Sequence, residues 1–176
     1  RFDLANQDKA TGRGMTVSAV SADSVGLVFS HQNNALTITL PRRFESGQRL
    51  RLRIAYSGEP ASGLKIANNR YGDRTFFSDN WPDKARHWLP TVDHPYDKAT
   101  SEMVVTAPAH YQVVSNGLLV EETDWPGDRR RTHWRQSVPI APWLYVLGVA
   151  RFAVQHVDTF QGKAIQTWVY AQDRDQ

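Results

Sequence analysis

Apolar and polar residues alternate with a period of two through much of this sequence, and this alternation constrains the fold more than any other feature. It is clearest at residues 35–40 and 50–56, where every second side chain is apolar. Successive side chains of a β-strand point to opposite faces, so such a segment places one face on a core and the other in water. We therefore predict strands along most of the chain and scarcely any helix.

Short strands and turn signals follow one another along the whole chain. Many short strands separated by Gly, Pro and Asn turns are typical of all-β folds. The fold class that we predict is all-β, an antiparallel β-sandwich or saddle-shaped sheet. Further strands are expected at residues 16–20, 27–29, 102–106, 111–115, 118–121, 131–135, 145–150 and 164–170, and turns at 41–47, 57–60, 68–73, 116–117 and 125–128.

The pair Asn116-Gly117 is the strongest hairpin signal in the sequence, because it lies between residues 111–115 and 118–122, which both read as strands. A type I′ turn requires positive φ at both central residues, and Asn-Gly is the pair that adopts it most readily. We predict a two-residue hairpin here, with Gly117 at a position where a side chain is strained.

Composition excludes several classes of function. The 21 basic residues are interspersed with 18 acidic ones, so the net charge of +3 does not predict a nucleic-acid partner. Cysteine is absent, which excludes disulfides and thiol chemistry. We see no run of about 20 apolar residues to span a membrane and no signal peptide, and the sequence leaves a periplasmic or a cytoplasmic location open. The length predicts a single β-domain at residues 1–171, with the polar residues 172–176 starting a linker.

The histidines do not form a standard metal site. None of the six has a second histidine four residues away, so no helix can present the paired imidazoles that a tetrahedral zinc site needs. His87, Asp93 and His94 are close in sequence, but Pro90 and Pro95 require an extended, turning backbone. We favour an ion pair in which Asp93 fixes this loop by binding Arg86 or Lys98. Ser101 lacks the surroundings of a nucleophile, because no Gly-x-Ser-x-Gly motif is present.

A set of residues at fixed spacing between positions 86 and 117 carries a family resemblance. An Arg is followed by a Pro, an Asp, a second Pro, a Lys and a closing Ser-Asn-Gly. This fingerprint resembles the amino-terminal β-domain of the aminopeptidase N family of zinc metallopeptidases, of the gluzincin type. The residues that carry it are Arg86, Pro90, Asp93, Pro95, Lys98, Asn116 and Gly117.

The resemblance implies that the chain is a non-catalytic part of a larger enzyme. Family members hold zinc through His-Glu-x-x-His in a following catalytic domain, and that motif is not in this sequence. The resemblance therefore implies zinc in the parent enzyme, none bound by this chain, and as partners the catalytic domain of the same polypeptide and a peptide substrate. Family members also begin this domain with earlier strands. We expect a fold truncated at its N-terminal edge, where a dimer formed through the bare edge would be an artefact.

The loop before Arg86 is the candidate substrate-binding segment. In the family, a Gln or Glu five residues before the Arg helps to hold the free α-amine, and Trp81 stands at that position here. An indole offers a cation–π contact of about 0.5–2 kcal/mol instead of a salt bridge, and Asp79 or Asn80 can supply the polar contact. The alternative is that Trp81 packs on a neighbouring domain and Asp79 caps a turn. The family's bond after that position is often cis, so we predict a cis Trp81–Pro82 bond.

A function of another class stays open beside this one. Exposed aromatic residues on a free-standing β-sandwich would make a protein- or carbohydrate-binding module that has no part in catalysis. The six tryptophans are compatible with such stacking, although Trp134, Trp143 and Trp168 lie in or beside predicted strands and are most simply core residues.

Overall fold

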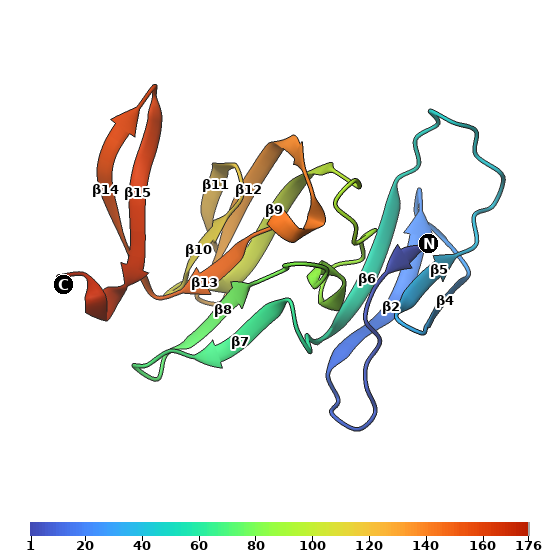
Figure 1. Ribbon diagram of the computed structural model, residues 1–176, viewed down its shortest axis with the longest axis horizontal. Coiled ribbons are helices and arrows are strands. Elements are labelled where there is room, and N and C mark those ends of the chain that lie inside the picture. The colour runs from blue at the N-terminus through green and yellow to red at the C-terminus, as the bar shows by residue number, and fades with distance from the viewer. Residues whose placement is uncertain (176) are drawn as a thin grey trace. The chain divides into compact units, whose positions relative to one another are not determined.

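A computed structural model describes residues 1–175 of the chain (Figure 1), and in that range it contains fifteen strands and three short 3-10 helices. The strand pairs whose registers are defined are antiparallel. This confirms the predicted all-β, antiparallel class. The chain divides into two compact units, and each unit is assembled from three separate chain segments.

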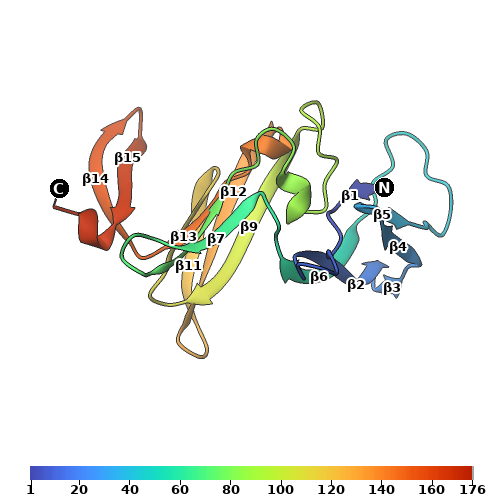
Figure 2. The same cartoon turned by 60° about the horizontal axis from the view of Figure 1, so that its bottom comes forward.

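Unit 1 consists of residues 1–64, 79–99 and 140–145. It contains two three-stranded sheets, ordered β1-β5-β4 and β3-β2-β6. Figure 2 shows their strands from a second direction. Its elements are β1 (Phe2–Asp3), β2 (Gly14–Ala22), β3 (Val25–Gly26), β4 (Phe29–Gln32), β5 (Ala35–Ile38), β6 (Leu52–Glu59), η1 (Ala85–His87) and η2 (Pro142–Leu144).

The core of unit 1 forms because β2 and β5 bury apolar side chains, and a register shift between Val17 and Ala19 brings Val20 to the buried face of β2. Leu4 and Leu36 have no exposed surface at all and contact the buried face of β2. Burying one such leucine stabilises the fold by about 1.5–3 kcal/mol. The other buried members of this cluster are Met15, Val17 and Val20.

Unit 2 consists of residues 65–78, 100–139 and 146–176, of which Gln176 lies outside the described residues. Its sheets have the orders β10-β13-β8-β7, β11-β12-β9 and β14-β15. Val113, Trp134 and Val149 form its buried core. Its strands are β7 (Leu64–Asn68), β8 (Arg74–Ser78), β9 (Ala99–Pro108), β10 (Gln112–Ser115), β11 (Leu118–Trp125), β12 (Arg129–Ile140), β13 (Leu147–Ala150), β14 (Phe152–Phe160) and β15 (Lys163–Tyr170).

The C-terminal residues bond to side chains of unit 2. Residues 171–173 form the 3-10 helix η3 (Ala171–Asp173). The Gln172 amide donates to Asp73 at 2.7 Å, and the Arg70 guanidinium and Tyr71 hydroxyl both donate to Asp173. Part of the segment expected to start a linker thus bonds to the β7–β8 turn. The single-domain boundary at residue 171 stays a prediction.

The expected hairpin at Asn116-Gly117 is wrong. β10 before the pair bonds to β13, and β11 after it bonds to β12, so the two flanking strands belong to different sheets. Gly117 has a φ of +86°, but Asn116 does not have the positive φ that a type I′ turn demands. The pair is a bend by which the chain leaves one sheet and enters another.

Two-residue hairpins occur instead at pairs that lack the Asn-Gly signature. Asp23-Ser24 joins β2 to β3 with φ of 47° and 69°, and Asn33-Asn34 joins β4 to β5 with φ of 52° and 57°. Positive φ at both central residues matches the right-handed twist of the flanking strands.

The strand predictions were wrong in extent at several places. Of residues 27–29, only Phe29 is in a strand. Residues 76–78 belong to β8, so the loop before Arg86 begins at Asp79. The predicted turn at 68–73 lies between β7 and β8, two strands that the alternation did not reveal because both are short. β3 and β14 were also missed.

Candidate functional site

The candidate site is the loop that follows β8, and its tip exposes an acid and an aromatic ring. The backbone N–H of Asp79 donates to the Gly63 carbonyl at 2.7 Å, which fixes the point where the loop begins. The Asp79 side chain is 76% exposed and its carboxylate lies 3.5 Å from Lys84 Nζ. The ring of Trp81 is also turned outward, and this residue is 61% exposed. The ion pair between Asp79 and Lys84 is solvated and therefore contributes little to stability.

Asn80, between these two residues, is buried and holds the loop from inside. It is 2% exposed. Its Oδ1 accepts a hydrogen bond from Trp88 Nε1 at 2.8 Å, and its Nδ2 donates to the Tyr145 carbonyl at 2.6 Å. The amide therefore joins two of the three chain segments of unit 1, residues 79–99 and 140–145. In this structure the Asn80 side chain is occupied by internal bonds, and Asp79 and Trp81 are the members of the predicted trio that face solvent.

Trp81 packs against a second indole that the sequence did not point to. The ring centroids of Trp81 and Trp143 are 4.6 Å apart and their planes are inclined by 39°. Trp143, expected in the core, is half-buried and lies in η2. The Trp81–Pro82 peptide bond is cis, which confirms that prediction.

The fingerprint residues Arg86 and Asp93 form the ion pair that the sequence predicted. Asp93 Oδ2 accepts from Arg86 Nε at 3.1 Å and from the Arg86 backbone N–H at 3.0 Å. The Asp93 carboxylate is 2% exposed, so this charge-assisted pair is shielded from water. The Asp93 backbone N–H donates to Asp3 Oδ2 at 3.1 Å, which attaches the loop to β1.

The remaining fingerprint residues shape the backbone. Pro90 precedes the bridge between Thr91 and Asp3, and Pro95 lies in the turn before Lys98. Lys98 is exposed, and its backbone N–H donates to the Tyr96 carbonyl at 2.9 Å. Among the residues described, Asp93 is therefore paired with Arg86 and not with Lys98.

Asn116 bonds to Val146, the residue just before β13, and Gly117 lies close to β12. Asn116 Oδ1 accepts from the Val146 N–H at 2.6 Å, and Ser115 Oγ donates to the Val146 carbonyl at 2.6 Å. A Cβ on Gly117 would lie 1.9 Å from the Arg135 carbonyl oxygen, so only glycine fits against β12 at this bend.

Burial shifts the pKa values of two titratable side chains near the loop, those of His87 and Tyr145. Burial and the neighbouring Arg86 guanidinium lower the pKa of His87. His87 Nδ1 is buried and, within residues 1–175, has no hydrogen-bond partner. Burial, together with the Asp97 carboxylate, raises the pKa of the Tyr145 hydroxyl.

The described residues do not fit a zinc ion. No three His, Asp or Glu side chains in residues 1–175 gather in a way that could hold a metal. We therefore assign no metal-dependent step to these side chains.

No helix in the described part of the chain has the length and apolar character needed to cross a membrane.

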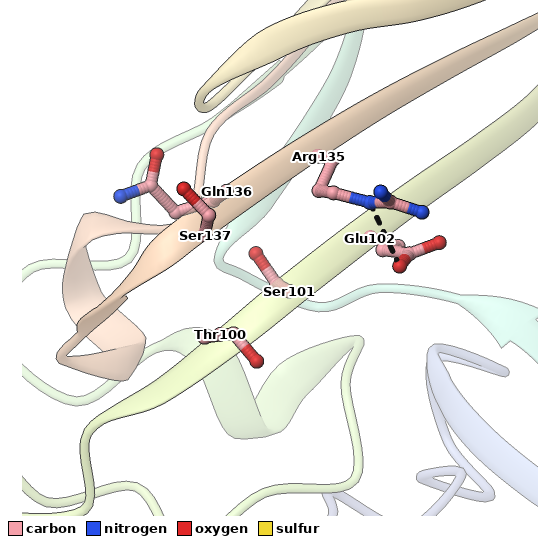
Figure 3. Close-up of a pocket in the computed structure, with 6 residues that line it drawn as sticks. All are labelled: Thr100, Ser101, Glu102, Arg135, Gln136 and Ser137. Carbon is pink, nitrogen blue, oxygen red and sulfur yellow. Dashed lines mark hydrogen bonds and ion pairs between the residues drawn. The ribbon is translucent and has the colours of Figure 1, made fainter.

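A polar hollow of about 300 Å³ lies between β9 and β12 in unit 2 (Figure 3). Glu102 accepts from Arg135 Nε at 3.1 Å and from His133 Nε2 at 2.8 Å, and the His133 bond does most to lower the pKa of Glu102. The charged groups of this hollow are thus paired with one another across the two strands. Its lining residues are Thr100, Ser101, Glu102, Arg135, Gln136 and Ser137.

Sequence reasoning missed the residues that support the loop from a distance. Trp88, Trp143 and Tyr145 contact it through a side chain or a carbonyl, and Asp3 binds the following turn. The sequence positions of the last three are remote from the loop. The one available signal was the concentration of apolar and aromatic residues at 142–145, of which only Tyr145 falls in a predicted strand.

Comparison with known sequences shows the family of the chain and several of its relatives. The sequence model of the family described as "Peptidase M1 N-terminal domain" matches residues 13–144. Human glutamyl aminopeptidase is 29% identical over 98 residues, which are 55% of this chain and 10% of that protein. "Transcription initiation factor TFIID subunit 2" of Drosophila melanogaster is 27% identical over 136 residues, 69% of this chain and 11% of that protein. The chain spans about a tenth of the length of these curated relatives.

Solved structures resemble the fold over nearly its whole length. An M1 zinc metallopeptidase from Deinococcus radiodurans has a TM-score of 0.77 and 25% sequence identity, covering 94% of this chain and 37% of that one. Legionella pneumophila aminopeptidase A, in complex with aspartic acid, has a TM-score of 0.76, covering 97% of this chain and 20% of that one. At 16% identity the second likeness concerns the fold alone.

Proposed function

The chain belongs to the family of peptidase M1 N-terminal domains, and from this premise we propose that it forms one wall of the active site of a zinc-dependent aminopeptidase. In this proposal the loop Asp79–Trp81 contributes to recognition of the amino terminus of the peptide substrate. The catalytic domain of the same polypeptide supplies the zinc ion and the reacting groups. This chain supplies binding and orientation and takes no covalent part.

The observation that carries the proposal is the contrast within the loop. Asp79 and Trp81 are exposed, whereas Asn80 between them is 2% exposed and bonded on both sides of its amide. A loop that displays a carboxylate and an indole from a fixed internal support is a rigid recognition element. Hydration of the charge by itself accounts for the exposed Asp79 carboxylate, so the exposed Trp81 indole is the feature that a binding role explains.

The chemistry of the two exposed groups suits an amino terminus. A carboxylate accepts charge-assisted hydrogen bonds from an α-ammonium group, and the face of an indole attracts the same cation. Both effects grow when a second domain excludes water from the site, because the effective dielectric constant falls. The solvated geometry of the isolated chain is the weaker state of this site.

A binding role without catalysis is the second candidate. It is favoured by the match to a Drosophila protein that carries the name of a transcription initiation factor and aligns with 69% of this chain. A similar sequence therefore occurs in a protein whose name is not that of a peptidase. In this alternative the exposed aromatic residues anchor a protein or carbohydrate partner, and no amine needs to be recognised.

The test uses the full-length protein that contains this chain. We expect about one zinc ion per polypeptide and hydrolysis of aminoacyl-4-nitroanilides that a chelator abolishes and added zinc restores. Asp79→Asn combined with Trp81→Gln should raise KM more than it lowers kcat, since the loop binds the substrate and does not react. Hydrolysis that is insensitive to both changes would remove the recognition role, and a full-length protein with no zinc and no hydrolysis would favour the binding module.

A further inference from the structure

We propose that Trp81 and Trp143 form an aromatic pair whose open face binds the substrate's amino terminus as a cation, so that the enzyme accepts N-methylated amino termini as well as primary amines. The inference rests on the proposed function. It adds a substrate class, peptides with an N-methylated or N-trimethylated first residue. It also assigns Trp143 as a positioning residue, which acts through Trp81.

The geometry leaves one face of Trp81 covered and the other open. Trp143 lies against the Trp81 ring at a centroid distance of 4.6 Å, with the two planes inclined by 39°, and Trp81 is nevertheless 61% exposed. An indole whose rear face rests on a second ring is immobilised at small cost in entropy. Its front face is the region of negative potential to which cations are attracted.

A buried hydrogen bond fixes the two rings relative to each other. Asn80 directly precedes Trp81, and its Nδ2 bonds at 2.6 Å to the carbonyl of Tyr145, two residues after Trp143. Asn80 also accepts a bond from Trp88 Nε1 at 2.8 Å. The backbones that carry the two indoles are thus connected through one side chain that is 2% exposed. All of these residues belong to unit 1.

The neighbouring acid is a poorer receptor for the ammonium group than its charge implies. The carboxylate of Asp79 already lies 3.5 Å from Lys84 Nζ, so a positive charge partly offsets it. The open ring face has no such competitor among the cation–ring contacts of residues 1–175, in which Arg42, Arg70, Arg74 and Arg131 lie over other rings.

Methylation separates the two modes of recognition. A carboxylate or amide oxygen binds an ammonium group through its N–H donors, and each methyl group removes one. A ring face binds the charge without using those donors, which is why quaternary ammonium ligands are recognised by aromatic residues. A receptor built from Trp81 therefore tolerates a change that a hydrogen-bonding receptor does not.

The experiment measures binding to the full-length protein by isothermal titration calorimetry with L-leucinamide and N,N,N-trimethyl-L-leucinamide. We expect the two dissociation constants to agree within about threefold in the wild type. Trp81→Gln should weaken the trimethylated ligand by about 2- to 30-fold, the span of a cation–π contact, with a smaller effect on leucinamide. A neutral analogue in which a tert-butyl group replaces the trimethylammonium group should bind more weakly than either.

Variants at the second ring test its positioning role. Trp143→Ala should change the ratio of the two dissociation constants in the same direction as Trp81→Gln does. Trp143→Phe should keep the ratio close to that of the wild type, because a phenyl ring can still support the indole. Trp125→Phe is the matched control. It changes a 41% exposed tryptophan in β11 of unit 2 and should leave the ratio unchanged.

The outcomes separate this inference from the proposed function. Hydrolysis of leucine anilide together with rejection of the trimethylated ligand would overturn the inference and leave the proposed function standing. Trp81-dependent binding of the trimethylated ligand without any hydrolysis would support the inference and overturn the proposed function. Equal binding by Trp81→Gln and wild type, or tight binding of the neutral analogue, would also overturn the inference, since the pair would then be a packing or apolar surface.

Discussion

At the scale of single residues, the site depends on side chains that are buried and polar. Such groups stabilise a fold when all their hydrogen bonds are made and destabilise it when a partner is lost. Asn80 is the clearest case, because both ends of its amide are bonded within unit 1. Its contribution to function is indirect, through the display of Asp79 and Trp81.

Replacing Asn80 should destabilise the fold in steps. Asn80→Leu removes both hydrogen bonds and should lower the free energy of unfolding by about 2–4 kcal/mol. Asn80→Asp keeps an acceptor for Trp88 Nε1 but turns a carboxylate oxygen toward the Tyr145 carbonyl in a buried site, so at neutral pH it should destabilise more than the leucine variant. Urea denaturation followed by tryptophan fluorescence measures the difference. Equal stability of the leucine variant and wild type would contradict the bonding described here.

His87 should make stability depend on pH. Burial holds its pKa in the folded state below the ordinary value of 6.5, so below that pH the unfolded chain binds more protons than the folded one. Stability is therefore complete above about pH 6.5 and is lost as the pH falls toward the lowered pKa. His87→Gln should lose less in melting temperature than wild type between pH 8 and pH 5.5. The exposed His110→Gln is the control and should follow wild type.

At the scale of elements, one glycine determines how the chain passes between sheets. Gly117 ends the bend between β10 and β11, and its φ of +86° and its close approach to β12 both exclude a side chain. The hairpin assignment failed at this point because Asn-Gly reports local backbone preference. Which strand pairs with which is decided by contacts that are distant in sequence.

The two costs of a side chain at Gly117 can be separated by a matched pair of variants. Gly117→Ala should lower the free energy of unfolding by about 2–4 kcal/mol, since it combines positive φ with a clash against the Arg135 carbonyl. Gly72→Ala has nearly the same φ, +85°, but open space around its Cβ, and should cost only about 1 kcal/mol. Thermal unfolding of both measures the difference, and indistinguishable melting temperatures would mean that the close contact is absent.

At the scale of the whole molecule, neither compact unit is a continuous piece of chain. Unit 1 needs residues 79–99 and 140–145 in addition to residues 1–64. The later segments are bonded into its β-structure, as in the bridge between Asp3 and Thr91 and the bond from the Ala5 N–H to the Arg86 carbonyl at 2.8 Å. The fingerprint loop is therefore structural for unit 1 as well as a support for the site.

This interleaving predicts that a fragment of residues 1–64 does not fold alone. It lacks Arg86, Thr91 and Asp93, which bond to the segment at residues 3–5. We expect a broad, non-cooperative thermal transition by circular dichroism, in contrast to a cooperative one for the 176-residue chain. A fragment that melts cooperatively with native-like near-ultraviolet signals would show that the later segments are dispensable.

The sequence by itself determined the features that depend on local chemistry. Alternation at residues 35–40 and 50–56 predicted strands because burial of one face requires it. The charge of Asp93 predicted an ion pair with Arg86 or Lys98 across a short, proline-restricted loop, and the partner is Arg86. The cis Trp81–Pro82 bond, which the family resemblance implied, is also present. Each of these depends on residues that are close together in the chain.

Only the tertiary structure decided which distant residues meet. The pairing of β10 with β13, the bond from the buried Asn80 to the Tyr145 carbonyl, and the contact of Trp143 with Trp81 all join segments that are more than thirty residues apart. Sequence patterns report the periodicity and propensity of a segment, and they carry no information on which other segment covers it. Asn80 and Trp81 are neighbours, and the sequence offered both as candidate substrate-binding residues. Only the packing of the folded chain placed Asn80 inside the protein and Trp81 in solvent.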